Sequence, residues 1–125
     1  MHHEPTPDEI ACATPDVLTL MLFQGAVRFG RRAQDALAHG DTAGGAHLIG
    51  RVRAIIRELD TTLNHDAGPI SGQLASIYEY LQRRLLVACE QPGALAEVVD
   101  SLDDLGRTWQ EIVESRAGQA LAATA

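Results

Sequence analysis

The chain has 125 residues, of which 46% are hydrophobic and 4% aromatic, and its formal net charge is −7 at pH 7. This length suits one compact domain with an aliphatic core, and the negative charge argues against a protein that neutralises the phosphates of nucleic acid. No apolar run approaches the roughly 20 residues of a membrane span and no signal peptide is recognisable, so we expect a soluble, cytoplasmic protein without membrane insertion.

The N-terminal residues predict an arm followed by a helix. Residues 1–13 contain two prolines and show no helical period, so we expect a flexible N-terminal arm. Thr14 suits an N-cap and Pro15 suits the first helical position, where its missing N–H costs nothing. This helix extends to about Ala38, and Gly40 with Asp41 supplies a stop and the next cap.

Two central helices follow, each with one apolar seam. The second helix is expected over residues 42–63 and the third over 69–89, with a loop at 64–68 between them. In both, apolar residues recur at alternating spacings of three and four, as in a helical bundle. The seam residues are Ile49, Val52, Ile56, Leu59 and Leu63 in the second helix, and Leu74, Tyr78, Leu81, Leu85 and Ala88 in the third.

The fourth helix begins near Pro92 and is expected to fade near Arg116, before a disordered tail at 117–125. Its apolar positions are Leu95, Val98, Leu102, Leu105, Trp109 and Ile112 or Val113. Helices of similar length joined by short loops must lie antiparallel to their neighbours. The sequence therefore predicts an all-α fold, an antiparallel up-down four-helix bundle over residues 14–116.

No motif for catalysis, a cofactor or a metal is present. No Glu is followed by His three residues later, as a di-iron bundle requires, and Cys12 and Cys89 fit no metal-ligand spacing. One alternative remains open, a histidine phosphotransfer bundle that uses His47, although the chain has no lysine to assist a phosphate. We expect a protein that is not an enzyme and has no cofactor.

Two helices carry more apolar surface than a bundle core needs. A second stripe consists of Leu48 and Ile55 on the second helix, and of Ile77, Tyr80 and Val87 on the third. Such stripes either pack against a second neighbouring helix or line a groove for an amphipathic helix of a partner. The five residues are therefore the candidate partner-binding positions.

Several segments, in this order and spacing, resemble one family. They are Thr14-Pro15, the segment Leu20 to Ala26, Ile55 to Leu59 with Leu63, Gly68, Tyr78 to Leu85, and Leu105 to Trp109. Together they resemble the FliS family of flagellar secretion chaperones, over about residues 13–112. Three departures are the absence of an aromatic residue in the arm, Phe23-Gln24 where Tyr-Asp is common, and Pro69 where a second Gly is usual. Because the arm lacks the aromatic residue, its usual fold over the bundle is not implied here.

The resemblance implies a function. Members of this family are helical bundles that bind the disordered C-terminal segment of flagellin in the cytosol, prevent its premature polymerisation and deliver it to the flagellar type III export gate. The resemblance implies no cofactor and no catalysis. The expected partners are thus the flagellin C-terminal segment and, with cargo bound, the export gate, while the free protein is a monomer or a weak homodimer.

Overall fold

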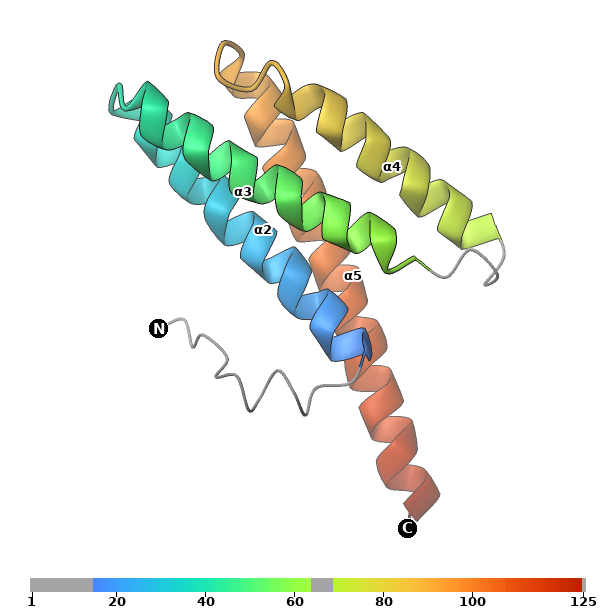
Figure 1. Ribbon diagram of the computed structural model, residues 1–125. Coiled ribbons are helices and arrows are strands. Elements are labelled where there is room, and N and C mark those ends of the chain that lie inside the picture. The colour runs from blue at the N-terminus through green and yellow to red at the C-terminus, as the bar shows by residue number, and fades with distance from the viewer. Residues whose placement is uncertain (1–14, 64–68, 125) are drawn as a thin grey trace.

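The computed structural model describes residues 15–63 and 69–124 and contains four helices within them. They are α2 (Pro15–Ala38), α3 (Thr42–Thr61), α4 (Pro69–Leu85) and α5 (Pro92–Thr124). Successive helices run in opposite directions, and each contacts the next, while α5 also contacts α2 and closes the ring (Figure 1). The predicted all-α four-helix bundle is confirmed.

The turn between α2 and α3 forms as its residues predict. Gly40 has a φ of 80°, a left-handed conformation that glycine adopts without strain, and so ends α2. The Asp41 side chain caps α3, because its Oδ1 accepts a hydrogen bond of 2.9 Å from the backbone N–H of Gly44. This short turn fixes α2 and α3 as antiparallel neighbours.

The core is formed by the predicted seams together with one face of α2. Its largest fully buried side chains are Phe23, Val52, Ile56, Leu59, Leu81, Leu95, Val98 and Leu102. Small residues let the helices approach closely. A Cβ on Gly30 would lie 2.6 Å from Cγ2 of Val99, and one on Gly25 would lie 3.7 Å from Cδ1 of Ile55. Gly30 therefore permits the close approach of α2 to α5, whereas the space at Gly25 would allow an ordinary contact with α3.

Trp109 on the last helix, α5, contacts the first helix, α2. Its indole Nε1–H donates a hydrogen bond of 3.0 Å to the backbone carbonyl of Asp16, and its ring lies 6.1 Å from that of Phe23. The Asp16 carboxylate also pairs with Arg116. Together these contacts join the beginning of α2 to the middle of α5.

Three predicted helix ends differ from the structure. The second helix ends at Thr61 rather than 63, because the hydroxyls of Thr61 and Thr62 bond to carbonyls of the last turn. The third helix ends at Leu85 rather than 89, since the following residues form tighter turns with bonds three residues apart, such as Ala88 N to Leu85 O.

The expected end of the fourth helix near Arg116 is wrong. Helix α5 continues to Thr124, so most of the segment 117–125 that we expected to be a disordered tail is helical. Alanine, which dominates this segment, has the highest helix propensity of all residues. The predicted arm at 1–13, the Thr14 cap and the loop at 64–68 lie outside the described residues.

Candidate partner-binding surface

The exposed large apolar side chains of the described residues gather on α4 and the turn after it. They are Ile70, 59% exposed, Ile77, 37%, Tyr80, 43%, and Leu86, 63%. Ile70 and Ile77 are seven residues apart and Tyr80 follows three residues later, so these three lie along one side of the helix. We call Ile70, Ile77 and Tyr80 the α4 row.

Polar contacts with α5 hold Tyr80 at one end of this row. The Tyr80 hydroxyl donates a hydrogen bond to Oε1 of Glu97, and Arg84 Nε lies 3.2 Å from Oε2 of the same carboxylate. The bond to Glu97 raises the pKa of Tyr80, because it favours the protonated phenol. Tyr80 therefore turns its hydroxyl to α5 and leaves much of its ring open to solvent.

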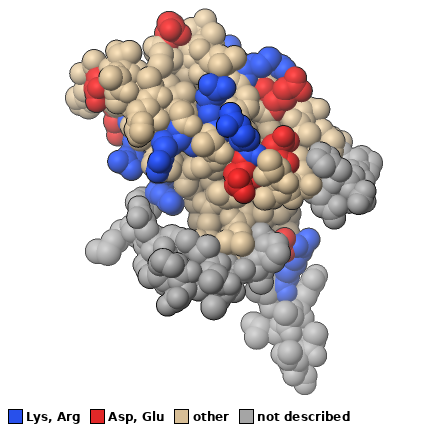
Figure 2. Space-filling view, in the orientation of Figure 1, with Lys and Arg blue, Asp and Glu red and all other residues tan. Residues whose placement is uncertain are grey.

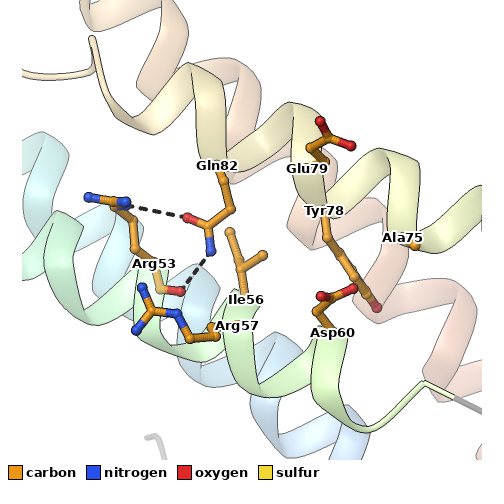
Figure 3. A pocket seen from close by; sticks show the side chains of 8 residues that line it. All are labelled: Arg53, Ile56, Arg57, Asp60, Ala75, Tyr78, Glu79 and Gln82. Carbon is orange, nitrogen blue, oxygen red and sulfur yellow. Dashed lines mark hydrogen bonds between the residues drawn. The ribbon is translucent and has the colours of Figure 1, made fainter.

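The opposite side of α4 forms a pocket with α3 (Figure 3). It has a volume of about 530 Å³ and is lined by Arg53, Ile56, Arg57, Asp60, Ala75, Tyr78, Glu79 and Gln82. Gln82 bridges the two helices, since its Nε2 donates to the Arg53 carbonyl at 2.9 Å and its Oε1 accepts from Arg53 Nε at 3.4 Å. Burial, together with the charge of Asp60, raises the pKa of Tyr78 to about 12.

The hydrogen bonds that Tyr80, Gln82 and Arg84 make to α3 and α5 help to hold α4 in place, because this helix packs less extensively than its neighbours. Its backbone approaches α3 and α5 less closely than the backbone of α2 approaches the same two helices. Figure 1 shows α4 along one edge of the bundle, separated in the view from α2 by α3. The apolar side chains that α4 exposes at this edge are thus the ones a partner could reach.

The structure divides the five predicted positions between two sides of the bundle. Ile77, Tyr80 and Val87 belong to α4 and its following turn, and Tyr80 faces α5. Leu48 and Ile55 are half-buried against the core, and Ile55 approaches Gly25 of α2. The five side chains therefore do not line a single groove.

Three residues of this surface, Ile70, Leu86 and Glu97, were missed from the sequence. Ile70 stands seven residues before Ile77, a spacing that could have extended the predicted stripe. Glu97 carried no signal of its own, because its pairing with Tyr80 depends on how α5 packs beside α4.

Other classes of function would require a phosphate-accepting histidine, a metal site or a membrane-spanning helix in the described part of the chain. His47 is exposed on α3. Residues 15–63 and 69–124 contain no group of three or more His, Cys, Asp or Glu side chains able to hold a metal ion. No helix among them combines the length and the apolar character needed to cross a bilayer.

Comparison with known proteins gives a consistent result. The family model described as flagellar protein FliS matches residues 4–116. The flagellar secretion chaperone FliS of Bacillus subtilis (strain 168) is 33% identical over 110 residues, which cover 86% of this chain and 82% of that protein. The flagellar secretion chaperone FliS of Salmonella typhimurium (strain LT2) is 33% identical over 107 residues, covering 82% and 79%.

Proposed function

This chain belongs to the FliS family of flagellar proteins, and on that basis we propose that it binds the C-terminal segment of flagellin in the cytoplasm and holds it for export. Its role as a flagellar export chaperone follows from the family. The identity of the cargo, its protection from premature polymerisation and its delivery to the type III export gate are the proposal. The protein acts by binding, without catalysis or a cofactor.

The observation that carries the proposal is the α4 row. Ile70, Ile77 and Tyr80 present apolar surface to solvent on α4, which packs beside α3 and α5. An amphipathic helix placed along this row would bury apolar residues that repeat every three or four positions. Val87 lies half-buried in the turn after α4.

The second apolar stripe on α3, Leu48 and Ile55, is less accessible to a cargo than the α4 row. Leu48 and Ile55 are already partly buried against the core, and Ile55 lies beside Gly25 of α2, so a cargo helix would reach only their exposed edges. A cargo that contacts both stripes must therefore pass around the bundle rather than lie in one groove. A disordered segment that folds on binding can do this, because it can wrap a large surface.

Coupled folding and binding supplies the energetic basis. A segment that orders on binding typically buries on the order of 1,000 to 3,000 Å² of surface, which offsets the entropy lost on ordering. The apolar faces that the cargo would use for assembly are then covered by the chaperone. We further propose that the export gate recognises the chaperone with its cargo bound, and that the free protein is a monomer or a weak homodimer.

Co-expression tests the proposal. The chaperone is produced with the last ~40 residues of a flagellin from the same genome, a length that allows a few helices at 1.5 Å per residue. A stable 1:1 complex on size-exclusion chromatography is expected, with helicity greater than the sum of the separate chains. A scrambled segment of equal composition is the control, and equal binding of both segments would contradict a specific cargo.

A further inference from the structure

Two arginines, one from α2 and one from α3, lie over a single phenylalanine ring on the outer side of the α2–α3 interface, and a third arginine lies one helical turn away on α2. The guanidinium carbons of Arg32 and Arg51 lie 5.7 and 5.2 Å from the centroid of the half-buried Phe29 ring. Arg28, one turn before Arg32, has an Nη2 atom 3.7 Å from the point that a Cβ on Gly25 would occupy. We call Arg28, Arg32 and Arg51 the Phe29 cluster.

None of these three guanidiniums has a carboxylate within ion-pair distance in the described residues. The arginines that do form ion pairs there are Arg31, Arg83, Arg84, Arg107 and Arg116. Because acidic residues outnumber basic ones by 17 to 10, the chain as a whole has no shortage of carboxylates. Figure 2 shows a band of blue side chains crossing the face that α2 and α3 make. A local cationic surface thus exists on an anionic protein.

The geometry of the cluster suits a carboxylate ligand. Two cations from different helices share one aromatic ring, whose face attracts them while their charges repel each other. A guanidinium that rests on a ring still presents the N–H groups at its edge, and these match the two oxygens of a carboxylate. An anion placed between the arginines would relieve the repulsion and use these donors.

We propose that the Phe29 cluster binds a short acidic segment of a protein partner. A long polyanion such as DNA fits less well, because the net charge of −7 repels it beyond the cluster. A short segment responds mainly to the local charge, since screening limits the range of interaction to about 8 to 10 Å at physiological salt. The surface differs from the α4 row, and the inference does not depend on flagellin as the cargo.

The test is a titration of the protein labelled with ¹⁵N-arginine, using a hexaglutamate peptide and observing the Nε–H signals by NMR. We expect saturable shifts of the Arg32 and Arg51 signals at roughly millimolar peptide, abolished by high salt. The double variant R32Q/R51Q should weaken binding about tenfold or more, as expected when charge-assisted bonds are removed. R107Q, which removes an arginine already paired with Asp103, is the matched control and should change affinity less than about twofold.

Three outcomes would overturn the inference. The first is equal shifts at paired and unpaired arginines, which would indicate non-specific attraction. The second is tighter binding of a six-nucleotide single-stranded DNA than of the peptide, which would assign the surface to nucleic acid. The third is unchanged affinity in R32Q/R51Q with helical content retained by circular dichroism.

Discussion

The hydroxyl of Tyr80 on α4 donates a hydrogen bond to the carboxylate of Glu97 on α5, and Arg84 shares that carboxylate. One acidic side chain thereby holds two side chains of the helix that packs least extensively in the bundle. These contacts are partly exposed to solvent, so their contribution to global stability is small and their main effect is local.

Glu97→Gln should loosen α4 without unfolding the bundle. The substitution removes the charge that Arg84 and Tyr80 share, at a cost under ~1 kcal/mol in the free energy of unfolding. Amide hydrogen exchange should quicken in α4 more than in α2 and α3, because local opening requires fewer contacts to break there. Uniform acceleration across all helices would mean that Glu97 supports the whole bundle.

Leu81→Ala should be strongly destabilising. Leu81 is 1% exposed, and truncating such a side chain costs about 2 to 5 kcal/mol through lost burial and the cavity left behind. Ile77→Ala is the matched change at a position 37% exposed and should cost less than about half as much. Chemical denaturation measures both, and equal losses would place Ile77 in the core.

Ile77→Asp should weaken binding of the flagellin segment at least tenfold, or about 1.4 kcal/mol, while the bundle stays helical. It puts a charge in the middle of the proposed α4 row, and isothermal titration measures the effect. Ala43→Asp, at an exposed position in the first turn of α3 and outside the row, should leave affinity nearly unchanged. Ile55→Asp should instead lower stability, because Ile55 packs against α2. Full affinity in Ile77→Asp would exclude the row as the docking surface.

Gly30→Ala should destabilise the protein by about 1 to 3 kcal/mol, because the new methyl group would overlap Val99 on α5. Gly50→Ala, where an added Cβ meets no atom within 4 Å, should stabilise it by about 0.5 to 1 kcal/mol. Thermal denaturation of the two variants compares the same chemical change at a helix contact and on an open helix face. A gain in both would show that α2 and α5 can separate slightly without loss.

Alkaline pH should weaken the fold through Tyr78. Its pKa of about 12 lies above the ordinary value of 10, so folding favours the protonated phenol. The stabilisation is therefore complete below pH 10 and is lost as the pH rises from 10 to 12, by roughly 2 to 3 kcal/mol. Denaturation between pH 8 and 12 measures it. Tyr78→Phe should make the free energy of unfolding less dependent on pH between 10 and 12. An unchanged slope would mean that another group causes the loss of stability.

The sequence predicted the bundle well because the relevant signals are local. Apolar spacing identified Val52, Ile56 and Leu81 as core residues, and Gly40 with Asp41 identified a turn. The helix ends were less predictable, since threonine hydroxyls end α3 early and alanine propensity extends α5. Local spacing says which residues share a face of a helix, but not which neighbouring helix meets that face.

Because spacing does not show which helix meets a given face, the candidate site was predicted only in part. Ile55 and Ile77 looked equivalent as members of second stripes, yet one packs beside Gly25 and the other is exposed. The difference depends on the close approach of α2 to α3 and the looser packing of α4, which are properties of the assembled bundle. For the same reason, the contact of Arg51 with a ring on another helix could not be read from helical spacing.

The position of Trp109 determines what fluorescence can report. It is the one tryptophan of the chain, and its indole lies between the carbonyl of Asp16 and the ring of Phe23, at the junction of α2 and α5. Its emission therefore monitors the closure of that junction, and should shift strongly when the bundle unfolds. A ligand that occupies only the α4 row would leave the emission nearly constant, so an intrinsic-fluorescence assay would miss it and an extrinsic dye on α4 would be needed.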